Sequence, residues 1–375
     1  MPFSGLGLMP VWIPMFALPN IEVEVAIELD GMALATMRDL RIQELAAQHQ
    51  RFSNYLDSFR SEFNRHIDPS IIIRRDDTPE LYRTVDALAG FRDAIALSVL
   101  PYAWATFLRY GHAPEVRYSD SFSIYPWMLD KNYEFVVMRS IGELGLDEAH
   151  ELRPQSLPGV TPRRLVRRNI DRPMLAALLQ RWSIRYSTAT PTWEDTALFR
   201  SLNMANAAAK LPATAGGTYY DIGRSVALWV SAFEILVHDG ASNAGYVYNN
   251  FDKAQWSLSE CKNQIYEVSS GKPKRNLACW IYNKLNKSRN DFLHGNPISD
   301  ATLLIQESGR PLLHYAPVLY RMALTARLDV HWKDAIPTDP IEDKEAFEKY
   351  FDFRYFQADM EAALATAIKP PATPV

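Results

Sequence analysis

The sequence predicts an α+β N-terminal region followed by an all-α bundle of four helices. The alternation of apolar and charged residues along Ile21–Leu29 is typical of a half-buried strand. Strand patterns fade after Asp171, and four helical patterns joined by loops rich in Gly, Asn, Ser and Pro follow Gly217. The chain has 375 residues, 47% hydrophobic and 22% charged, which is the composition of a globular protein of about two domains.

The N-terminal region combines short strands with one long helical stretch. Besides Ile21–Leu29, strand-like patterns lie at Ile71–Ile73, Phe122–Tyr125 and Phe135–Met138. The helical stretch begins at Thr78-Pro79-Glu80, because threonine suits the N-cap and proline the first helical turn. We therefore expect a mixed α+β fold here.

Two apolar segments and the cysteine content indicate the cellular compartment in which the protein is expected. Gly5–Pro19 is interrupted by three prolines and no Lys or Arg precedes Arg38, so we interpret it as a core segment and not a signal peptide. Ala94–Leu108 is shorter than the ~20 residues that span a bilayer, and we expect a buried helix. The only cysteines, Cys261 and Cys279, lack the spacing of a disulfide framework or a zinc site. A reducing, cytoplasmic setting without membrane contact is expected.

Helix signals define the remaining organisation. Asp171 and Pro173 open one helix and Pro191–Lys210 forms a second, so a boundary falls between Tyr186 and Gly217. We expect a mixed α+β domain over residues 1–190 with a sensing, substrate-selecting or regulatory role, a helical linker over 191–216, a helical bundle over 217–335, and an acidic helical segment with a frayed tail over 336–375. The predicted bundle helices are Tyr220–His238, Ser257–Ser269, Pro273–His294 and Pro311–Trp332.

The third bundle helix ends in a motif that can carry chemistry. Its last residues read Arg-Asn-Asp-Phe-Leu-His-Gly, with four residues between Arg289 and His294 and with Gly295 as the expected helix cap. On an ideal helix Arg289 and His294 lie about 140° apart, while Asn290 and Lys287 fall within about 40° of His294. His294 therefore shares a polar face with Asn290 and Lys287, flanked by Arg289.

This motif, preceded by a helix containing Ala-Leu-Trp-Val-Ser-Ala-Phe-Glu-Ile-Leu, resembles the Arg-x4–6-His signature of HEPN-domain proteins, in particular the ApeA-like bacterial HEPN branch. The resemblance covers Gly217 to Trp332, about a third of the chain. It implies an HEPN-like bundle and metal-independent RNA cleavage between two bundles of a homodimer. It assigns Arg289 and His294 as catalytic, with Asn290 as the polar residue that follows the arginine, and it requires no cofactor.

The chemistry implied by the resemblance is coherent with the residue types. Histidine acts as general acid or base near neutral pH, here on the ribose 2′-hydroxyl or the leaving 5′-oxygen. The guanidinium of Arg289 suits the charge that develops on phosphorus oxygens. The expected products carry a 2′,3′-cyclic phosphate and a 5′-hydroxyl. In the alternative interpretation Arg289 binds helix-end carbonyls or a carboxylate, and His294 only caps the helix dipole.

Glu234 is the sole charged residue of Val226–His238, a segment apolar nearly all round, which predicts burial and therefore a partner. Arg289 or a lysine of the third helix is one candidate, and Glu234 would then orient the catalytic arginine. An ion pair with Arg224 or Arg321 that has only a structural role is an equally weighted alternative.

Positive charge is concentrated locally, although the net charge is −4. Lys262–Arg289 holds seven basic residues and one acidic residue, Glu267, which gives a local excess of +6 beside the motif. A second basic stretch, Arg153–Arg185, holds eight arginines. Either stretch is a candidate for RNA contact. Equally weighted alternatives are that the first stretch is a solvated face and that the second lies at a domain interface. The residues we assign to RNA binding are Lys274, Arg275, Lys284 and Lys287.

We therefore expect a cytoplasmic endoribonuclease, homodimeric, with a possible regulatory partner protein and, by family analogy, a toxin or antiviral defence role. The alternative of a different class is a non-catalytic HEPN interaction module that dimerises or binds a nucleotide or protein. A metal-dependent hydrolase using His238 and Asp239 is a distant third, since no spaced partner ligands accompany the pair.

Overall fold

The computed structural model describes residues 11–61, 63–112, 114–138, 160–212, 218–237 and 244–369. Contacts divide the chain into two compact units. The first unit is formed by Met1–Ala89, Asp120–Arg167 and Tyr186–Thr190, and the second by Gly90–Ser119, Arg168–Arg185 and Pro191–Val375. Two segments of residues 1–190, Gly90–Ser119 and Arg168–Arg185, thus fall in the second unit.

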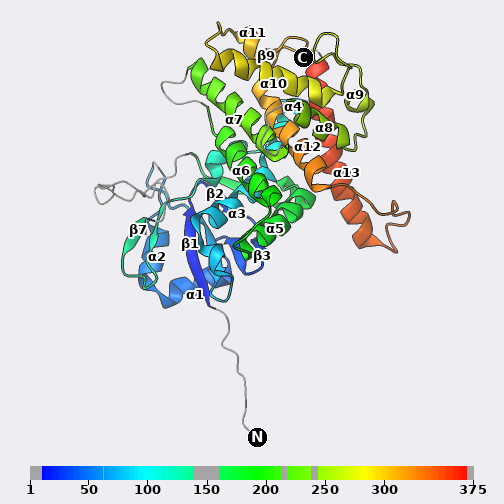
Figure 1. The fold of residues 1–375 in the computed structure, drawn as a ribbon. Coiled ribbons are helices and arrows are strands. Elements are labelled where there is room, and N and C mark those ends of the chain that lie inside the picture. Colours follow the sequence, from blue (N-terminus) through cyan, green and yellow to red (C-terminus); the bar gives the residue numbers. More distant parts are fainter. Residues whose placement is uncertain are drawn as a thin grey trace. The chain divides into compact units, whose positions relative to one another are not determined.

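A four-stranded antiparallel sheet forms the centre of the first unit (Figure 1). Its strand order is β1 (Trp12–Leu18), β5 (Ser70–Arg75), β4 (Met32–Ala35) and β3 (Ile27–Leu29). The three isoleucines Ile71–Ile73 are fully buried, as expected for an apolar run in a central strand covered on both faces. Two helices, α1 (Leu40–Gln48) and α2 (Gln50–Asp57), contribute Ile42, Leu45, Phe52 and Leu56 to the same core.

Two smaller sheets correct the predicted strands. Ile21–Leu29 is not one strand: β2 (Ile21–Val23) pairs in parallel with β8 (Arg163–Leu165), whereas β3 joins the central sheet, so the backbone bends at the exposed Val25 between them. Phe122–Tyr125 is not a strand either, because Phe122 ends a 3-10 turn. The prediction at Phe135–Met138 agrees with β7 (Val136–Met138), which pairs with β6 (Trp127–Leu129).

The second unit is built from helices. Local caps explain where several begin: the Asp171 carboxylate accepts the Met174 N–H at 3.2 Å, and the Asn276 amide oxygen accepts the Cys279 N–H at 3.0 Å. In chain order the helices that lie wholly or partly in this unit are α3 (Val85–Leu97), α4 (Leu100–Tyr110), α5 (Arg172–Ser187), α6 (Trp193–Ala208), α7 (Tyr219–Val237), α8 (Ala244–Lys253), α9 (Ser259–Lys262), α10 (Leu277–Leu293), α11 (Asp300–Leu303), α12 (Ala316–Leu328) and α13 (Lys344–Ala365).

Four of these helices, α7, α8, α10 and α12, all contact one another. The predicted second helix at Ser257–Ser269 was wrong, because only α9 is helical there. Its place is taken by α8, which buries Val247 and Phe251 four positions apart on one face. The aromatic rings of Phe251 and Phe233 face Tyr282 in the core between α8, α7 and α10.

The segments flanking these four helices belong to the same packed unit. The predicted linker contains α6, whose Leu198, Leu202 and Ala205 are buried and which packs along α7. The acidic C-terminal segment forms α13, which buries Phe356 and Met360 and packs against α4. Within the described ranges no helix combines the length and the apolarity needed to cross a bilayer.

Candidate active site

The motif singled out in the sequence lies at the C-terminal end of α10. The helix buries Leu277, Ile281, Leu285 and Ser288, so one face is fixed in the core and the last turn emerges from it. Gly295 adopts a φ of 69°, and the Asn296 N–H donates to the Asp291 carbonyl at 3.0 Å, which is the hydrogen bond of a Schellman cap. Gly295 thus ends the helix directly after His294.

Arg289 and Glu234 are brought together across α10 and α7. Glu234 Oε2 lies 3.5 Å from Arg289 Nη2, and the two side chains are 12% and 24% exposed. Arg289 Nη1 also donates to the Asn290 side-chain oxygen at 3.1 Å. The alternative partners of Glu234 are engaged elsewhere, since Arg224 pairs with its neighbour Asp221 and Arg321 pairs with Asp171. The partly buried carboxylate is therefore matched by the motif arginine.

His294 occupies a different environment from Arg289. It is the C-cap residue of α10, its backbone N–H donates to the Asn290 carbonyl at 3.0 Å, and its side chain is exposed. Across the residues that the structure describes, the imidazole makes no hydrogen bond or ion pair, so both ring nitrogens are accessible to a ligand. Arg289 is held toward α7, in agreement with the wide angle expected between the two side chains on one helix.

The start of α7 approaches the end of α10 closely, which the sequence analysis did not anticipate. A Cβ placed on Gly223 would lie 2.1 Å from Cδ1 of Phe292, so only glycine lets the Phe292 ring lie against this helix. A glycine inside an otherwise helical pattern was the available sequence signal. Nearby, the Tyr219 hydroxyl donates to Asp300 at 2.7 Å.

The four residues assigned to RNA binding fall into two classes. Lys284 lies 3.1 Å from Glu307 and 4.2 Å from the centre of the Trp280 ring, and Arg275 is ion-paired with Asp252. Lys274 and Lys287 are exposed and form no ion pair within the described ranges. Only the last two keep their charge unmatched for a phosphate.

Three of the eight arginines in the arginine-rich stretch contact carboxylates. Arg164 lies 3.3 Å from Glu24, Arg172 pairs with Asp352, and Arg181 pairs with Asp195. These contacts favour a structural role for the stretch over RNA binding. Residues 153–159 at its start, and the alternative pair His238 and Asp239, lie outside the described residues. Among the residues described, no three His, Cys, Asp or Glu side chains gather into a group that could hold a metal ion.

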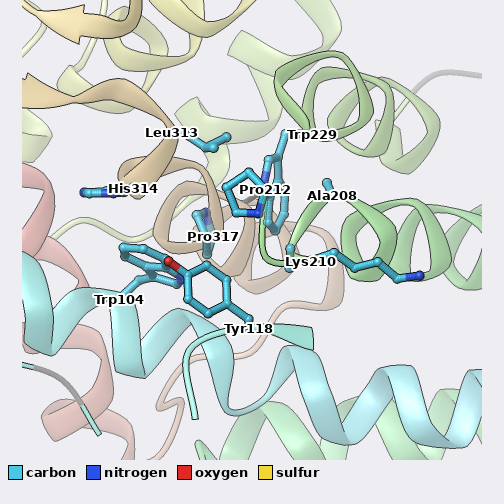
Figure 2. Close-up of a pocket in the computed structure, with 10 residues that line it drawn as sticks. Trp104, Tyr118, Ala208, Lys210, Pro212, Trp229, Leu313, His314 and Pro317 are labelled. Carbon is cyan, nitrogen blue, oxygen red and sulfur yellow. The ribbon is translucent and has the colours of Figure 1, made fainter. Parts of the chain in front are cut away.

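A second titratable group, missed in the sequence, lies beside a small cavity of about 40 Å³ (Figure 2). The His314 ring stacks on Trp104 with centroids 4.5 Å apart. Burial, and then the charge of Arg117, lower the pKa of His314 to about 4. The cavity is too small for an organic ligand, and the lowered pKa keeps His314 neutral at physiological pH.

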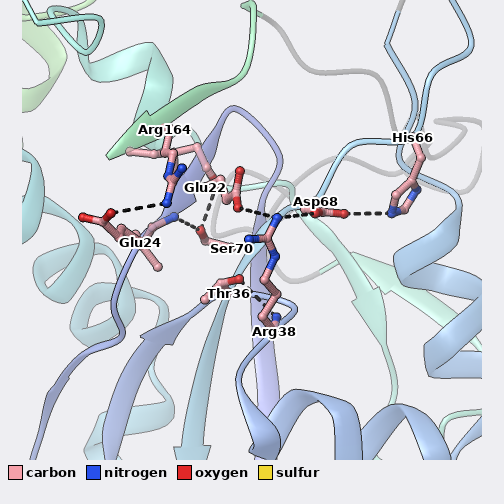
Figure 3. Close-up of polar contacts among 10 residues, drawn as sticks. Glu22, Glu24, Thr36, Arg38, His66, Asp68, Ser70 and Arg164 are labelled. Carbon is pink, nitrogen blue, oxygen red and sulfur yellow. Dashed lines mark hydrogen bonds and ion pairs between the residues drawn. The ribbon is translucent and has the colours of Figure 1, made fainter. Parts of the chain in front are cut away.

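The first unit carries a chain of polar contacts that includes Ser, His and Asp (Figure 3). His66 Nε2 lies 3.0 Å from Asp68, and Arg38 lies 3.9 Å from Asp68 and 3.6 Å from Glu22. Ser70, however, is fully buried, donates to the Ile21 carbonyl at 2.9 Å and accepts the Val23 N–H at 3.0 Å. Its hydroxyl holds two strand segments together and makes no hydrogen bond to His66, so the group lacks the contacts of a catalytic triad.

Comparisons of the chain with protein-family models, with curated proteins and with solved structures found no match.

Proposed function

We propose that this chain is a metal-independent endoribonuclease of HEPN type, with α7, α8, α10 and α12 as the HEPN-like bundle. The observation that carries the proposal is the contact between Glu234 and Arg289. It fixes a guanidinium near the end of α10, five positions before an exposed histidine, and it gives Glu234, the only charged residue of Val226–Val237, a partner within the motif.

The residues suit attack by the ribose 2′-hydroxyl. His294 accepts the 2′-hydroxyl proton, the 2′-oxygen bonds to phosphorus, and the bond from phosphorus to the 5′-oxygen breaks, leaving a 2′,3′-cyclic phosphate. The 5′-oxygen leaves with a proton from an acid. Arg289 carries five N–H donors, so its contacts with Glu234 and Asn290 leave donors for the phosphate oxygens.

A homodimer would supply the missing acid. The chain holds one Arg289–His294 motif, and a second copy facing the same phosphate would provide a protonated His294 for the 5′-oxygen. Lys274 and Lys287, exposed and without carboxylate partners in the described ranges, would guide RNA toward this surface. A toxin or defence role and a regulatory partner protein extend the proposal by family analogy.

The test is cleavage of total tRNA and of a generic single-stranded RNA in excess EDTA. We compare the unmodified chain with His294→Ala and Arg289→Ala, and use His112→Ala, an exposed histidine outside the motif, as the matched control. We expect cleavage by the unmodified chain and by His112→Ala only, with cyclic phosphate ends. Circular dichroism of all four proteins separates loss of chemistry from loss of fold.

Equal cleavage by all four proteins would remove the motif from the chemistry. The alternative is then a non-catalytic HEPN interaction module that dimerises or binds a nucleotide or protein. The partial burial of Arg289, 24% exposed and ion-paired, is the observation that favours this second function. It predicts that Arg289→Ala changes self-association in sedimentation velocity while RNA stays intact.

A further inference from the structure

The second unit contains a larger pocket that the proposed nuclease chemistry does not use. Its volume is about 570 Å³, within the range of small-molecule sites. The walls come from the last turns of α12 and the segment after it, from α13, and from the residues that follow α8. None of these elements carries Arg289 or His294. The lining residues used below are Arg321, Trp332, Asp334, Tyr350, Phe353 and Arg354.

Three aromatic rings form one wall of the pocket. The Trp332 ring lies 5.5 Å from the Tyr350 ring and 6.0 Å from the Phe353 ring, both in edge-to-face arrangements. Such a wall offers ring faces on which a flat ligand can stack. The indole N–H of Trp332 is buried and has no acceptor within the described part of the chain.

One charged residue of the pocket, Arg354, suits an anion. Arg354 is exposed and makes no hydrogen bond or ion pair with any described residue, so its guanidinium is available to a ligand. Arg321, only 2% exposed, donates to Asp171 at 2.8 Å and to Gln357 at 2.9 Å and fixes the floor. The charge of Arg321 is already matched by Asp171, so Arg354 is the cation left for a ligand, and the lining contains one carboxylate, Asp334.

We propose that this pocket binds a small organic anion that contains a flat aromatic ring. The ring stacks against Trp332, Tyr350 and Phe353, and the phosphate or carboxylate is held by the fork-shaped guanidinium of Arg354. The anion comes from a nucleotide or from an aromatic carboxylate, which share this chemistry. This inference is independent of the nuclease proposal, because it concerns other residues and a binding equilibrium.

Isothermal titration calorimetry with the full chain tests the proposal. The probes are the four nucleoside 5′-monophosphates and indole-3-carboxylate. The four nucleosides, which lack the anionic group, and inorganic phosphate, which lacks the aromatic ring, are the comparison ligands. We expect at least one aromatic anion to bind with a dissociation constant below about 1 mM, and more tightly than its nucleoside or phosphate alone. Which probe binds identifies the source of the anion.

Variants locate the binding. Arg354→Ala should weaken it about tenfold or more, and Tyr350→Leu, which keeps an apolar side chain but removes the aromatic face, should weaken it severalfold. Lys349→Ala, an exposed cation on the same helix outside the pocket, is the matched control and should bind like the unmodified chain. The proposal is overturned if no probe binds, if Arg354→Ala leaves binding unchanged, or if phosphate alone binds as tightly as the aromatic anions.

Discussion

Glu234 in α7 and Arg289 in α10 are joined by a contact of 3.5 Å between Oε2 and Nη2. The two residues are 55 positions apart in the sequence, so the contact exists only when α7 and α10 are packed. It therefore couples the geometry of the motif to the integrity of the helix pair. A displacement of α7 would therefore also displace the guanidinium of Arg289, although Arg289 lies on α10.

The first prediction concerns the strength of this coupling. A double-mutant cycle of Glu234→Ala and Arg289→Ala should give an interaction free energy of ~0.5–2 kcal/mol, because both side chains are partly buried and removal of either leaves the other charge without its partner. Urea unfolding of the two single variants and the double variant measures it. The exposed pair Lys344 and Glu348 is the comparison, and its cycle should be close to zero. Strict additivity at Glu234 and Arg289 would contradict the prediction.

The second prediction concerns the close approach of α7 to α10. Alanine is intrinsically more favourable than glycine inside a helix, by ~1 kcal/mol, yet Gly223→Ala should destabilise the chain by ~1–3 kcal/mol because the new Cβ displaces the Phe292 ring. Urea unfolding measures whether the substitution lowers or raises the free energy of unfolding. In a Phe292→Ala background the same substitution should become neutral or stabilising. Stabilisation by Gly223→Ala with Phe292 intact would show that the ring moves away without cost.

The third prediction concerns pH. His314 has a pKa of about 4 in the folded chain and ~6.5 when unfolded, so between these values the unfolded chain binds a proton that the folded chain does not. The free energy of unfolding should therefore fall by ~3 kcal/mol as the pH is lowered from 6.5 to 4, and this contribution should change no further below that.

The control for this effect is His314→Phe, which keeps an aromatic ring against Trp104 but cannot titrate. Urea unfolding near pH 7 and near pH 4.5 should show that His314→Phe loses less stability than the unmodified chain on acidification. Asp93 and Asp359, whose pKa values burial raises, act in the opposite direction but are present in both proteins and cancel in the comparison. Parallel pH profiles would contradict the assignment to His314.

The fourth prediction separates the basic residues. In the His294→Ala background, where RNA should stay intact, Lys287→Ala should weaken RNA binding and lower the slope of log affinity against log salt by ~0.7. Lys284→Ala should have a smaller effect, because its charge is already matched by Glu307. Fluorescence anisotropy over a salt series measures both. An equal effect of the two substitutions would mean that the Glu307 contact breaks on binding.

Sequence patterns predicted those features that local interactions determine. The apolar strand at Ile71–Ile73, the helix that starts at Asp171 and the helix over Pro191–Lys210 can be recognised from residues adjacent in the sequence, and the structure confirms them. The cap at Gly295 is equally local, since a positive φ after the last helical turn favours glycine.

Features that depend on residues far away in the sequence could not be predicted from local patterns. Ile21–Leu29 is split because β2 pairs with β8, which lies more than a hundred positions further along the chain. Burial of Glu234 could be predicted but its partner could not, because several arginines were equally plausible in sequence. Lys284 and Arg275 looked free for RNA until Glu307 and Asp252, from other segments, were placed beside them.

The polar contacts of Arg321, which lines the pocket of about 570 Å³, constrain the order in which the chain can fold. Asp171 binds Arg321, Arg321 binds Gln357, Gln357 donates to Glu361 at 2.6 Å, and Glu361 accepts the backbone N–H of Ser257 at 2.9 Å. These residues come from four separate stretches, and the last of them lies in α13. During synthesis Gln357 and Glu361 must leave the ribosome before Arg321 and the Ser257 N–H have all of their partners. The helical unit therefore has its full set of contacts only after α13 has emerged.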